Sequence, residues 1–371
     1  MDLPPFLLDR WIEQKHTANP PIEFDLGSST GPVWTLRELL ALSADDQLED
    51  LLDARISYTN SIGTPALRAA IAQLEVVEPD EVQVVTGASE ALLILFFLAA
   101  EPGANVLLPN PGFPANAGLA EAFGIEIRYY RLRAENQFRV DFDEIRRLTD
   151  RNTRMLLVNS PHNPTGAVLT DDELESLHDF CAERNIPFVS DQVYHPVYHG
   201  PEMRSAARLP HATVISDFSK ALCLSGLRVG WMIEHDAKRR ERYHNARNHF
   251  TITSSMLSER LAAFALTNRE KIYARARHVA QTNLAILDGF FAQQQERMQW
   301  VRPRGGMTVF PWLVDGADTR DFCRRLAGRG VLIVPGDCFG QPAHFRLGFA
   351  ASGNQFPQAM ERFADFLRGA S

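Results

Sequence analysis

Lys220 has the surroundings that a lysine needs to react with an aldehyde. It follows the strand-like residues Thr213–Ile215 and precedes a loop of small residues, so its amine is held near a backbone turn. An amine in such a place forms a Schiff base with a carbonyl compound once its pKa is lowered. Arg228, eight residues later, is a candidate for binding a phosphate. The pair alone is also typical of a surface ion pair, so the upstream segments decide the interpretation.

Asp191 ends an apolar strand, and Tyr194 follows it three residues later. A carboxylate at the carboxyl end of a parallel strand points into the crevice where open α/β sheets bind ligands. There it keeps the nitrogen of a pyridine ring protonated, and Tyr194 is placed to reach a hydroxyl group on the same ring. The alternative is an aspartate that caps the next turn.

Asn163 lies in the sequence Asn-Pro-Thr-Gly, directly after the apolar strand Met155–Val158. A residue before proline is restricted to extended geometry, so the backbone aims the amide of Asn163. That amide is able to donate to a phenolate oxygen. The same four residue types also form plain turns.

Small residues follow the strand at Val82–Thr86 and lead into a long apolar helix that reaches Ala100. Gly87, Ala88 and Ser89 let backbone N–H groups at the helix start approach a phosphate, which the helix dipole favours. The segment lacks the patterns of a P-loop or a dinucleotide fold, so a single phosphate is the expected ligand. Phe113, held between prolines, is placed to stack on a flat ring or to fill the core.

Together these motifs resemble the fold-type-I pyridoxal-phosphate enzymes, and among them the class I/II aminotransferases. The resemblance is collinear over nearly the whole chain. The matching segments, in the family's order, are Tyr58, Gly63–Arg68, Gly87–Ser89, Phe113, Asn163–Gly166, Asp191 with Tyr194, Ser219–Lys220, Arg228 and Arg346. The resemblance implies an enzyme that uses pyridoxal 5'-phosphate to convert an L-amino acid to its 2-oxo acid.

The resemblance also implies roles for the cofactor residues. Lys220 carries the internal aldimine and, once the substrate amine frees it, moves a proton between the α-carbon and the cofactor. Asp191 pairs with the ring nitrogen, which makes the ring an electron sink. The ring oxygen is held by Asn163 and Tyr194, and Phe113 stacks on the ring. The residues that receive the phosphate are Gly87, Ala88, Ser89, Ser219 and Arg228.

Arg346 matches the arginine that grips the substrate α-carboxylate in a bidentate pair. Its alternative is an arginine at a strand end in a surface ion pair. Gly27 resembles the glycine whose backbone lies beside the substrate, and Asn163 belongs to the same substrate-binding set. Tyr58 resembles the tyrosine that reaches a phosphate across a dimer interface. This implies a homodimer with a shared active site.

Asp217 departs from the family pattern, because many relatives carry a phosphate-binding Ser or Thr three residues before the lysine. An acid there repels a phosphate unless it is turned away or protonated. The Asp-Phe-Ser-Lys form also resembles a subgroup that includes capreomycidine synthase, whose members cyclise or eliminate. A pyridoxal-phosphate-dependent β-lyase or cyclase is therefore an alternative function. A regulator that binds the cofactor without turnover is another, and Arg346 and the absence of a helix-turn-helix extension count against it.

Composition agrees with a soluble enzyme, since the 371 residues are 45% hydrophobic and carry a net charge of −8. This charge disfavours binding to nucleic acid or to an anionic membrane, and the basic residues at 238–242 are expected to be a solvated helix face. No secretory signal or membrane span is evident. The four cysteines have no C-x-x-C spacing, which favours reduced thiols and a cytoplasmic protein. His195 and His199 flank Pro196 without the Glu of a zincin motif, so no metal is expected.

Strands alternate with helical stretches, which predicts an α/β fold. We expect the fold-type-I transferase architecture, with a mainly parallel seven-stranded sheet in a large domain at residues 49–268. Residues 1–48 and 269–371 are expected to form a smaller α+β domain. Sheet strands are predicted at 82–86, 105–108, 125–130, 155–159, 188–191, 214–217 and 229–233. The later part is predicted as helices at 269–295 and 319–329 and strands at 307–312, 331–334 and 344–349.

Overall fold

The computed structural model describes residues 3–43 and 47–369, and its central feature is a seven-stranded sheet. The strand order is β2-β8-β7-β6-β5-β3-β4, and β8 runs antiparallel to both of its neighbours. The strands are β2 (Val82–Val85), β3 (Asn105–Asn110), β4 (Glu126–Arg131), β5 (Thr153–Asn159), β6 (Phe188–Asp191), β7 (Ala212–Asp217) and β8 (Gly230–Ile233). The mainly parallel α/β fold predicted from the sequence is confirmed.

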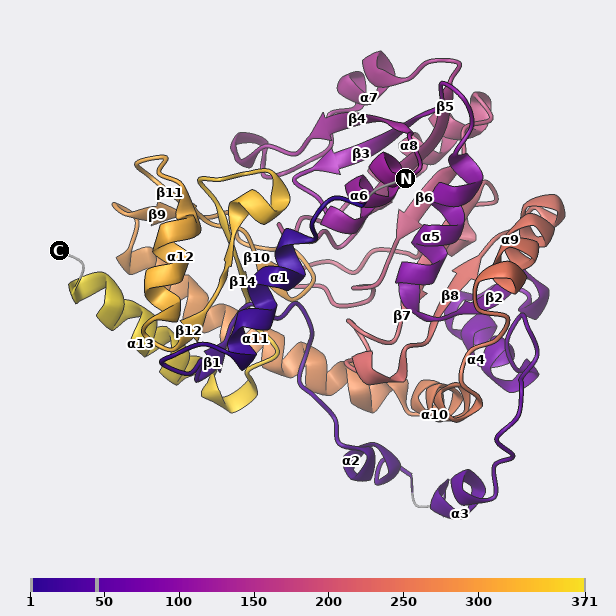
Figure 1. Cartoon of the computed structure of the whole chain (residues 1–371), viewed down its shortest axis with the longest axis horizontal. Helices are drawn as coiled ribbons and strands as arrows, with labels where there is room; N and C mark the ends of the chain where they lie inside the picture. The colour runs from indigo at the N-terminus through magenta and orange to yellow at the C-terminus, as the bar shows by residue number, and fades with distance from the viewer. Residues whose placement is uncertain (1–2, 44–46, 370–371) are drawn as a thin grey trace.

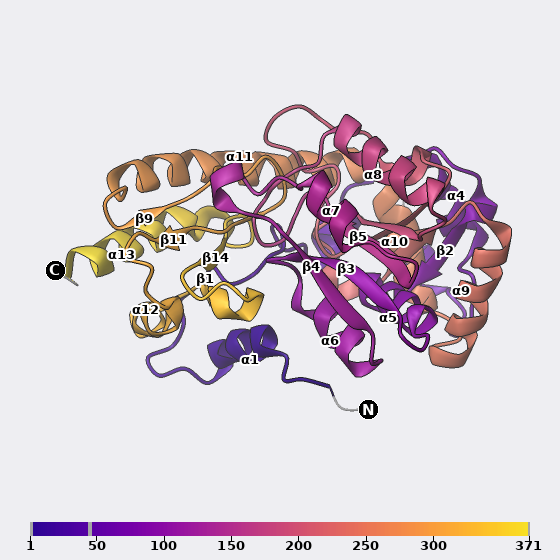
Figure 2. The ribbon, with the colours of Figure 1, turned by 90° about the horizontal axis from the view of Figure 1, so that it is seen from above.

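Both faces of this sheet are covered, because successive strand residues point to opposite sides. In β5, Leu157 packs into a cluster with α5 (Gly87–Ala99), α6 (Pro114–Ala122) and α9 (Ala237–Phe250). Its neighbours Leu156 and Val158 pack on the other face, toward α4 (Pro65–Glu75), α8 (Asp171–Glu183) and α10 (Met256–Thr267). Figure 2 shows the two helix layers on opposite sides of the strands. Burial on both faces explains why the central strands read as continuous apolar runs.

Among the remaining helices α11 is the longest, with 25 residues, and Figure 1 shows it running along the lower side of the molecule. These helices are α1 (Leu7–Glu13), α2 (Leu36–Leu40), α3 (Gln47–Leu52), α7 (Phe142–Leu148), α11 (Arg269–Gln293), α12 (Thr319–Ala327) and α13 (Phe356–Gly369). No helix in the described part of the chain is both long enough and apolar enough to cross a membrane.

The carboxyl-terminal third of the chain contributes short strands, and two strands predicted there, at 307–312 and 331–334, are wrong because each is divided. The strand expected at 307–312 is divided at Pro311 into β10 (Thr308–Val309), which pairs with β14 (Phe345–Gly348), and β11 (Trp312–Leu313), which pairs with β9 (Met298–Gln299). Proline lacks the N–H that a continuous ladder needs.

The strand expected at 331–334 is divided at Ile333. Its first half, β12 (Val331–Leu332), pairs in parallel with β1 (Phe24–Asp25), and its second half, β13 (Val334–Pro335), pairs with β14. The carbonyl of Ile333 accepts a hydrogen bond of 2.7 Å from Trp11 Nε1 instead. The chain therefore switches partners within one apolar run, which hydrophobicity alone does not reveal.

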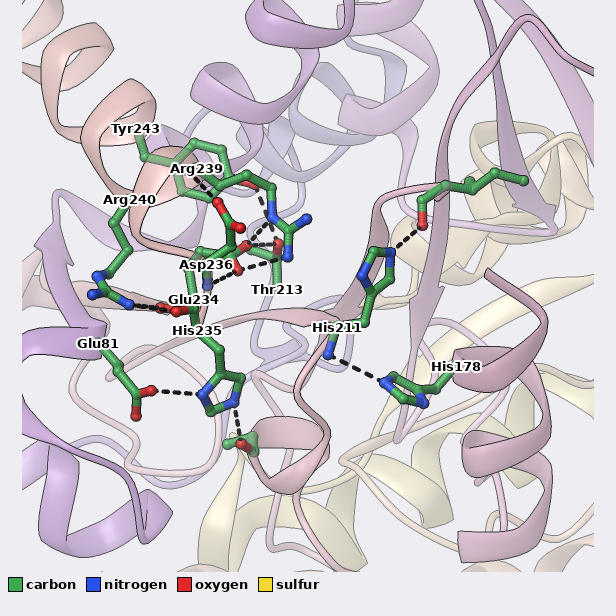
Figure 3. A network of polar contacts seen from close by, with 12 residues as sticks. Glu81, His178, His211, Thr213, Glu234, His235, Asp236, Arg239, Arg240 and Tyr243 are labelled. Carbon is green, nitrogen blue, oxygen red and sulfur yellow. Dashed lines mark hydrogen bonds and ion pairs between the residues drawn. The ribbon is translucent and has the colours of Figure 1, made fainter. Parts of the chain in front are cut away.

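A polar network where β7 begins and β8 ends corrects the expectation of a solvated basic face on α9 (Figure 3). Glu234 is 1% exposed and accepts from Nε and Nη2 of Arg239, both at 2.9 Å. It also accepts from Thr213 Oγ1 at 2.6 Å, and Arg240 donates to its backbone carbonyl at 3.0 Å. Arg239 and Arg240 thus fix α9 to the sheet, while Arg242 is exposed as expected.

Candidate active site

The carboxyl ends of the parallel strands carry polar residues that meet at one edge of the sheet. Asn159 ends β5, Asp191 ends β6 and Asp217 ends β7, and the ladder register places Asn159 beside Asp191. Parallel strands bring their carboxyl ends to a common edge, which is where α/β sheets bind ligands. A cavity of about 200 Å³ opens at this edge. Its lining is Ala88, Ser89, Leu92, Phe113, Asn159, Asn163, Asp191, Val193, Tyr194, Asp217, Ser219, Lys220, Ser225 and Arg228.

Most of the cofactor residues expected from the sequence line this cavity, so segments from positions 88 to 228 meet there. Gly87 lies next to the cavity and starts α5. Tyr58 does not join them: its side chain is 83% exposed on this chain. The roles assigned to these residues stay predictions, but their convergence is a property of the structure.

Lys220 follows the end of β7 and is half-buried. Burial lowers its pKa to about 8; the charge of Asp217 opposes this shift and that of Arg346 adds to it. A lysine with a pKa this low is partly neutral near pH 7, and the neutral amine is the nucleophile. Its Nζ donates to Ser29 Oγ at 2.9 Å.

Asp191 is buried at the end of β6, where Oδ1 accepts from the N–H of Val193 at 3.2 Å. Burial is the largest cause that raises its pKa, to about 7, and the negative charge of Asp217 raises it further. Such a carboxyl group gains most from a cationic partner that is also buried. A protonated ring nitrogen would be a partner of this kind.

The phosphate end of the expected cofactor is shaped by two glycines. Gly87 has φ +73°, in the left-handed region that favours glycine, and a Cβ there would lie 2.8 Å from Arg228 Nη2. A Cβ on Gly230 would lie 2.9 Å from the backbone nitrogen of Ala88. Arg228 itself adopts φ 51°, ψ 45°, a conformation that a non-glycine residue adopts at a cost. The backbone therefore holds the arginine against the start of α5.

Arg346 lies in β14 and is 1% exposed. Nη2 donates to the carbonyl of Gly27 at 2.7 Å, and Nη1 donates to Asn163 Oδ1 at 3.2 Å. Its Nε is buried and has no partner among the described residues. An arginine remains charged even where burial lowers its pKa. The structure thus brings the three expected substrate residues into one cluster with a free donor.

The sequence did not reveal roles for Asn159 and Ser29. Asn159 Oδ1 accepts from the N–H of Asn163 at 2.8 Å, and its Nδ2 donates to the carbonyl of Asp191 at 3.1 Å. It therefore ties two expected site residues together. Asn159 ends an apolar strand, as Asp191 does, and this position could have identified it as a site residue. The contact of Ser29 with Lys220 had no such signal, because nothing local in the sequence places residue 29 near residue 220.

The two histidines considered as metal ligands have other partners. His195 Nδ1 lies 2.7 Å from the Tyr198 hydroxyl, and His199 Nε2 donates to the carbonyl of Gly306 at 2.8 Å. Neither lines the cavity. The four cysteines are buried and form no disulfide.

These residues fit pyridoxal phosphate. A partly neutral lysine, a buried carboxyl group and an arginine beside a helix start lie around one cavity, and they match the aldehyde, the ring nitrogen and the phosphate in chemistry. The unpartnered Nε of Arg346 adds a site for a carboxylate. One group disagrees with this fit: the Asp217 carboxylate, which lies at the phosphate end.

Comparison with known proteins gives a consistent result. Residues 32–366 match the family described as aminotransferase class I and II. Capreomycidine synthase from Streptomyces vinaceus is 31% identical over 373 residues, which cover 98% of this chain and 94% of that protein. The crystal structure of a PLP-dependent aminotransferase from Streptococcus suis has a TM-score of 0.93 at 27% identity and covers 100% of this chain and 99% of that one. That of the PLP-dependent cyclase OrfR has a TM-score of 0.90 at 25% identity, with the same coverage.

Proposed function

This chain belongs to the class I and II aminotransferases and is a pyridoxal-phosphate-dependent enzyme, and we propose that Lys220, Asp191 and Arg346 carry its reaction. The reaction converts an L-amino acid to its 2-oxo acid. When bound, pyridoxal phosphate supplies an aldehyde and a ring that withdraws electrons from the bonds of the substrate α-carbon. The residues of the chain then have to hold the substrate and move its protons.

The observation that carries this proposal is the placement of a half-buried lysine and a buried carboxyl group on one cavity, with a buried arginine beside it. In the proposal, Lys220 attaches the cofactor and then moves a proton at the α-carbon, a step that an amine with a pKa of about 8 performs in both directions near neutral pH. Asp191 holds the proton of the ring nitrogen. Arg346 binds the α-carboxylate through Nε and Nη atoms and so fixes which bond faces Lys220.

The other cavity residues orient the cofactor in this proposal. Phe113 stacks on the ring, and Asn163 and Tyr194 hold its oxygen. The phosphate is received at the start of α5, where unpaired N–H groups and the helix dipole favour an anion. The phosphate set is Gly87, Ala88, Ser89, Ser219 and Arg228. Gly27 lies beside the substrate carboxylate through its contact with Arg346.

We also propose a cytoplasmic homodimer in which Tyr58 of one subunit reaches the phosphate of the other. Support comes from the exposure of apolar side chains next to Tyr58, with Ile56 89% and Leu52 67% exposed. A groove of about 810 Å³ lies on the same part of the chain, between α4 and α10, and its lining includes Leu40, Leu51 and Phe264. An apolar groove beside exposed apolar residues is typical of a subunit interface. We propose in addition that residues 49–268 form a large domain, and that residues 1–48 and 269–371 together form a small one.

The first experiment is a visible absorption spectrum of the purified protein, recorded with single amino acids and without an oxo-acid acceptor. We expect one amino acid to change the spectrum in a single turnover and to release one equivalent of its 2-oxo acid per site. A protein without a cofactor band, even after pyridoxal phosphate is added, would contradict the assignment.

Cyclisation or elimination on the same cofactor is a second candidate. The observation that favours it is the likeness to a protein named capreomycidine synthase and to one described as a cyclase. The same experiment separates the two reactions. Continuous turnover that releases ammonia or a cyclised product and restores the initial spectrum would assign the second reaction.

A further inference from the structure

Asp217 ends β7, and its buried carboxylate holds donors at the phosphate end of the cavity. Oδ1 accepts from the N–H of Ser219 at 2.8 Å. Oδ2 accepts from Ser219 Oγ at 2.9 Å and from the N–H of Ala88 at 3.4 Å. Ala88 and Ser219 belong to the proposed phosphate set. The carboxylate thus makes contacts that the phosphate would make.

The position of this carboxylate is fixed by its neighbours. Asp217 pairs with Gly230 in the ladder between β7 and β8. A Cβ on Gly230 would lie 2.8 Å from Ser216 O and 2.9 Å from the nitrogen of Ala88, so β8 and the start of α5 are in close contact here. In this close contact Asp217 Oδ2 accepts from the N–H of Ala88, so the carboxylate is directed toward the start of the helix.

The positive charges around the Asp217 carboxylate are sufficient for one anion and not for two. The start of α5, a helix of 13 residues, carries a partial positive charge. Arg228 Nη1 lies 3.4 Å from Ser219 Oγ, the same hydroxyl that donates to Asp217. A phosphate that enters brings a second anion to donors already in use, and two anions in contact repel each other.

We propose that Asp217 is a built-in competitor for the phosphate site, so that the phosphate must displace its carboxylate from Ala88 and Ser219 in order to bind. Asp217 therefore selects against the phosphate group of the cofactor. It weakens retention of pyridoxal phosphate relative to unphosphorylated pyridoxal and lets the cofactor exchange with the solution. This inference rests on the proposed function, because it needs the cofactor to bind in this cavity.

The test is a comparison of two ligands on the cofactor-free protein. Pyridoxal phosphate and pyridoxal are titrated separately, and binding is followed by visible absorption, for the wild type, Asp217→Asn and Asp217→Ser. The measured quantity is the Kd for pyridoxal divided by the Kd for pyridoxal phosphate, so a higher ratio means a stronger preference for the phosphate. Asp217 opposes the lowering of the pKa of Lys220 by burial, but a change at the lysine affects both ligands and cancels in this ratio.

We expect both variants to favour pyridoxal phosphate over pyridoxal by about tenfold more than the wild type does, since a hydrogen bond to a charged group contributes about that factor. The control is Asp318→Asn, which removes one carboxylate at the exposed start of α12, where Asn also serves as a cap. Its ratio should equal that of the wild type. Dissociation of pyridoxal phosphate, measured after dilution, should be slower in both Asp217 variants.

Folding is checked with inorganic phosphate. Asn and Ser place no negative charge against the donors of Ala88 and Ser219, so an entering phosphate meets no like charge there, and the variants should gain more thermal stability from added phosphate than the wild type gains. If Asp217→Asn does not fold, Asp217→Ser provides the same comparison. An unchanged or lower Kd ratio in a folded variant would overturn the competitor role alone. A wild-type protein that binds neither pyridoxal compound would overturn the cofactor assignment, and this inference with it.

Discussion

Lys220 Nζ donates a hydrogen bond of 2.9 Å to the hydroxyl of Ser29, 191 residues earlier in the chain. The carbonyl of Ser29 accepts from the Tyr194 hydroxyl at 2.9 Å. One residue of the loop after β1 therefore contacts both the proposed cofactor lysine and the proposed ring-oxygen ligand. The amino-terminal segment therefore contacts two residues that line the cavity.

Replacement of Lys220 by Ala should abolish attachment of the cofactor. Turnover should fall by at least about 10³-fold, because the nucleophile and the proton carrier are lost together. Borohydride reduction followed by peptide mass spectrometry measures attachment: the peptide that contains Lys220 carries the cofactor only in the wild type. Lys238→Ala, an exposed lysine of α9, is the control. Wild-type turnover in Lys220→Ala would contradict the assignment.

Replacement of Arg346 by Lys should raise KM for the amino acid about 10- to 100-fold, because the charge remains but the planar fork is lost. Steady-state kinetics measure this change. The matched control is a change of substrate: the amine that lacks the α-carboxylate should react equally slowly with the wild type and the variant. If the variant also slows the amine, Arg346 acts on something other than the carboxylate.

Replacement of Asp191 by Asn should stabilise the cofactor-free protein at pH 8. The pKa of Asp191 is raised from 3.8 to about 7, mainly by burial. Between these values the native state binds more protons than the unfolded state, so stability falls as pH rises through this window. The variant should be more stable by up to about 4 kcal/mol above pH 7 and equal to the wild type near pH 4. Urea unfolding at a series of pH values measures the difference, and a constant difference across the series would contradict the raised pKa.

Replacement of Glu234 by Gln should lower the free energy of unfolding by about 2–4 kcal/mol. Glu234 is buried, and Arg239 would be left with half of its pair in the network of Figure 3. Asp321→Asn is the control, since it breaks exposed pairs with Arg324 and Arg325 and should cost less than about 1 kcal/mol. Chemical unfolding of the two variants compares them. Equal effects would show that the buried pair stabilises the protein no more than an exposed pair does.

Replacement of Tyr58 by Ala should weaken binding of pyridoxal phosphate about tenfold if its hydroxyl completes the site of the other subunit. A mixture of Tyr58→Ala and Lys220→Ala, unfolded and refolded together, should regain activity above that of either variant. In the mixed dimer one site combines Lys220 of one chain with Tyr58 of the other. Absence of any gain in a proven mixed dimer would contradict a shared site.

The sequence predicted the sheet well because each strand is a short apolar run that ends at a polar residue or a turn. The strand expected at 188–191 has the observed bounds, and the others differ by a few residues at their ends. Runs buried on both faces are strong local signals. The residues around Lys220 were found for a related reason, since Asp191 and Asn163 directly follow such runs.

The rest depended on contacts between distant segments. The division at Ile333 arises because β1 pairs with one part of the apolar run and β14 pairs with the other. The partial burial of Arg239 arises because it pairs with the buried Glu234, as Figure 3 shows. The contact of Ser29 with Lys220 is of the same kind. Local propensity carries no information on which distant segments meet.

The pairing of β1 with β12 sets an order of events during protein synthesis. Every strand of the seven-stranded sheet has left the ribosome soon after Ile233 is made, so this sheet can form early. Phe24 has no strand partner among the described residues until Val331 has been added, and Arg346, the proposed carboxylate ligand, comes later still. The nascent chain therefore acquires the proposed cofactor lysine well before it acquires the arginine proposed to hold the amino acid.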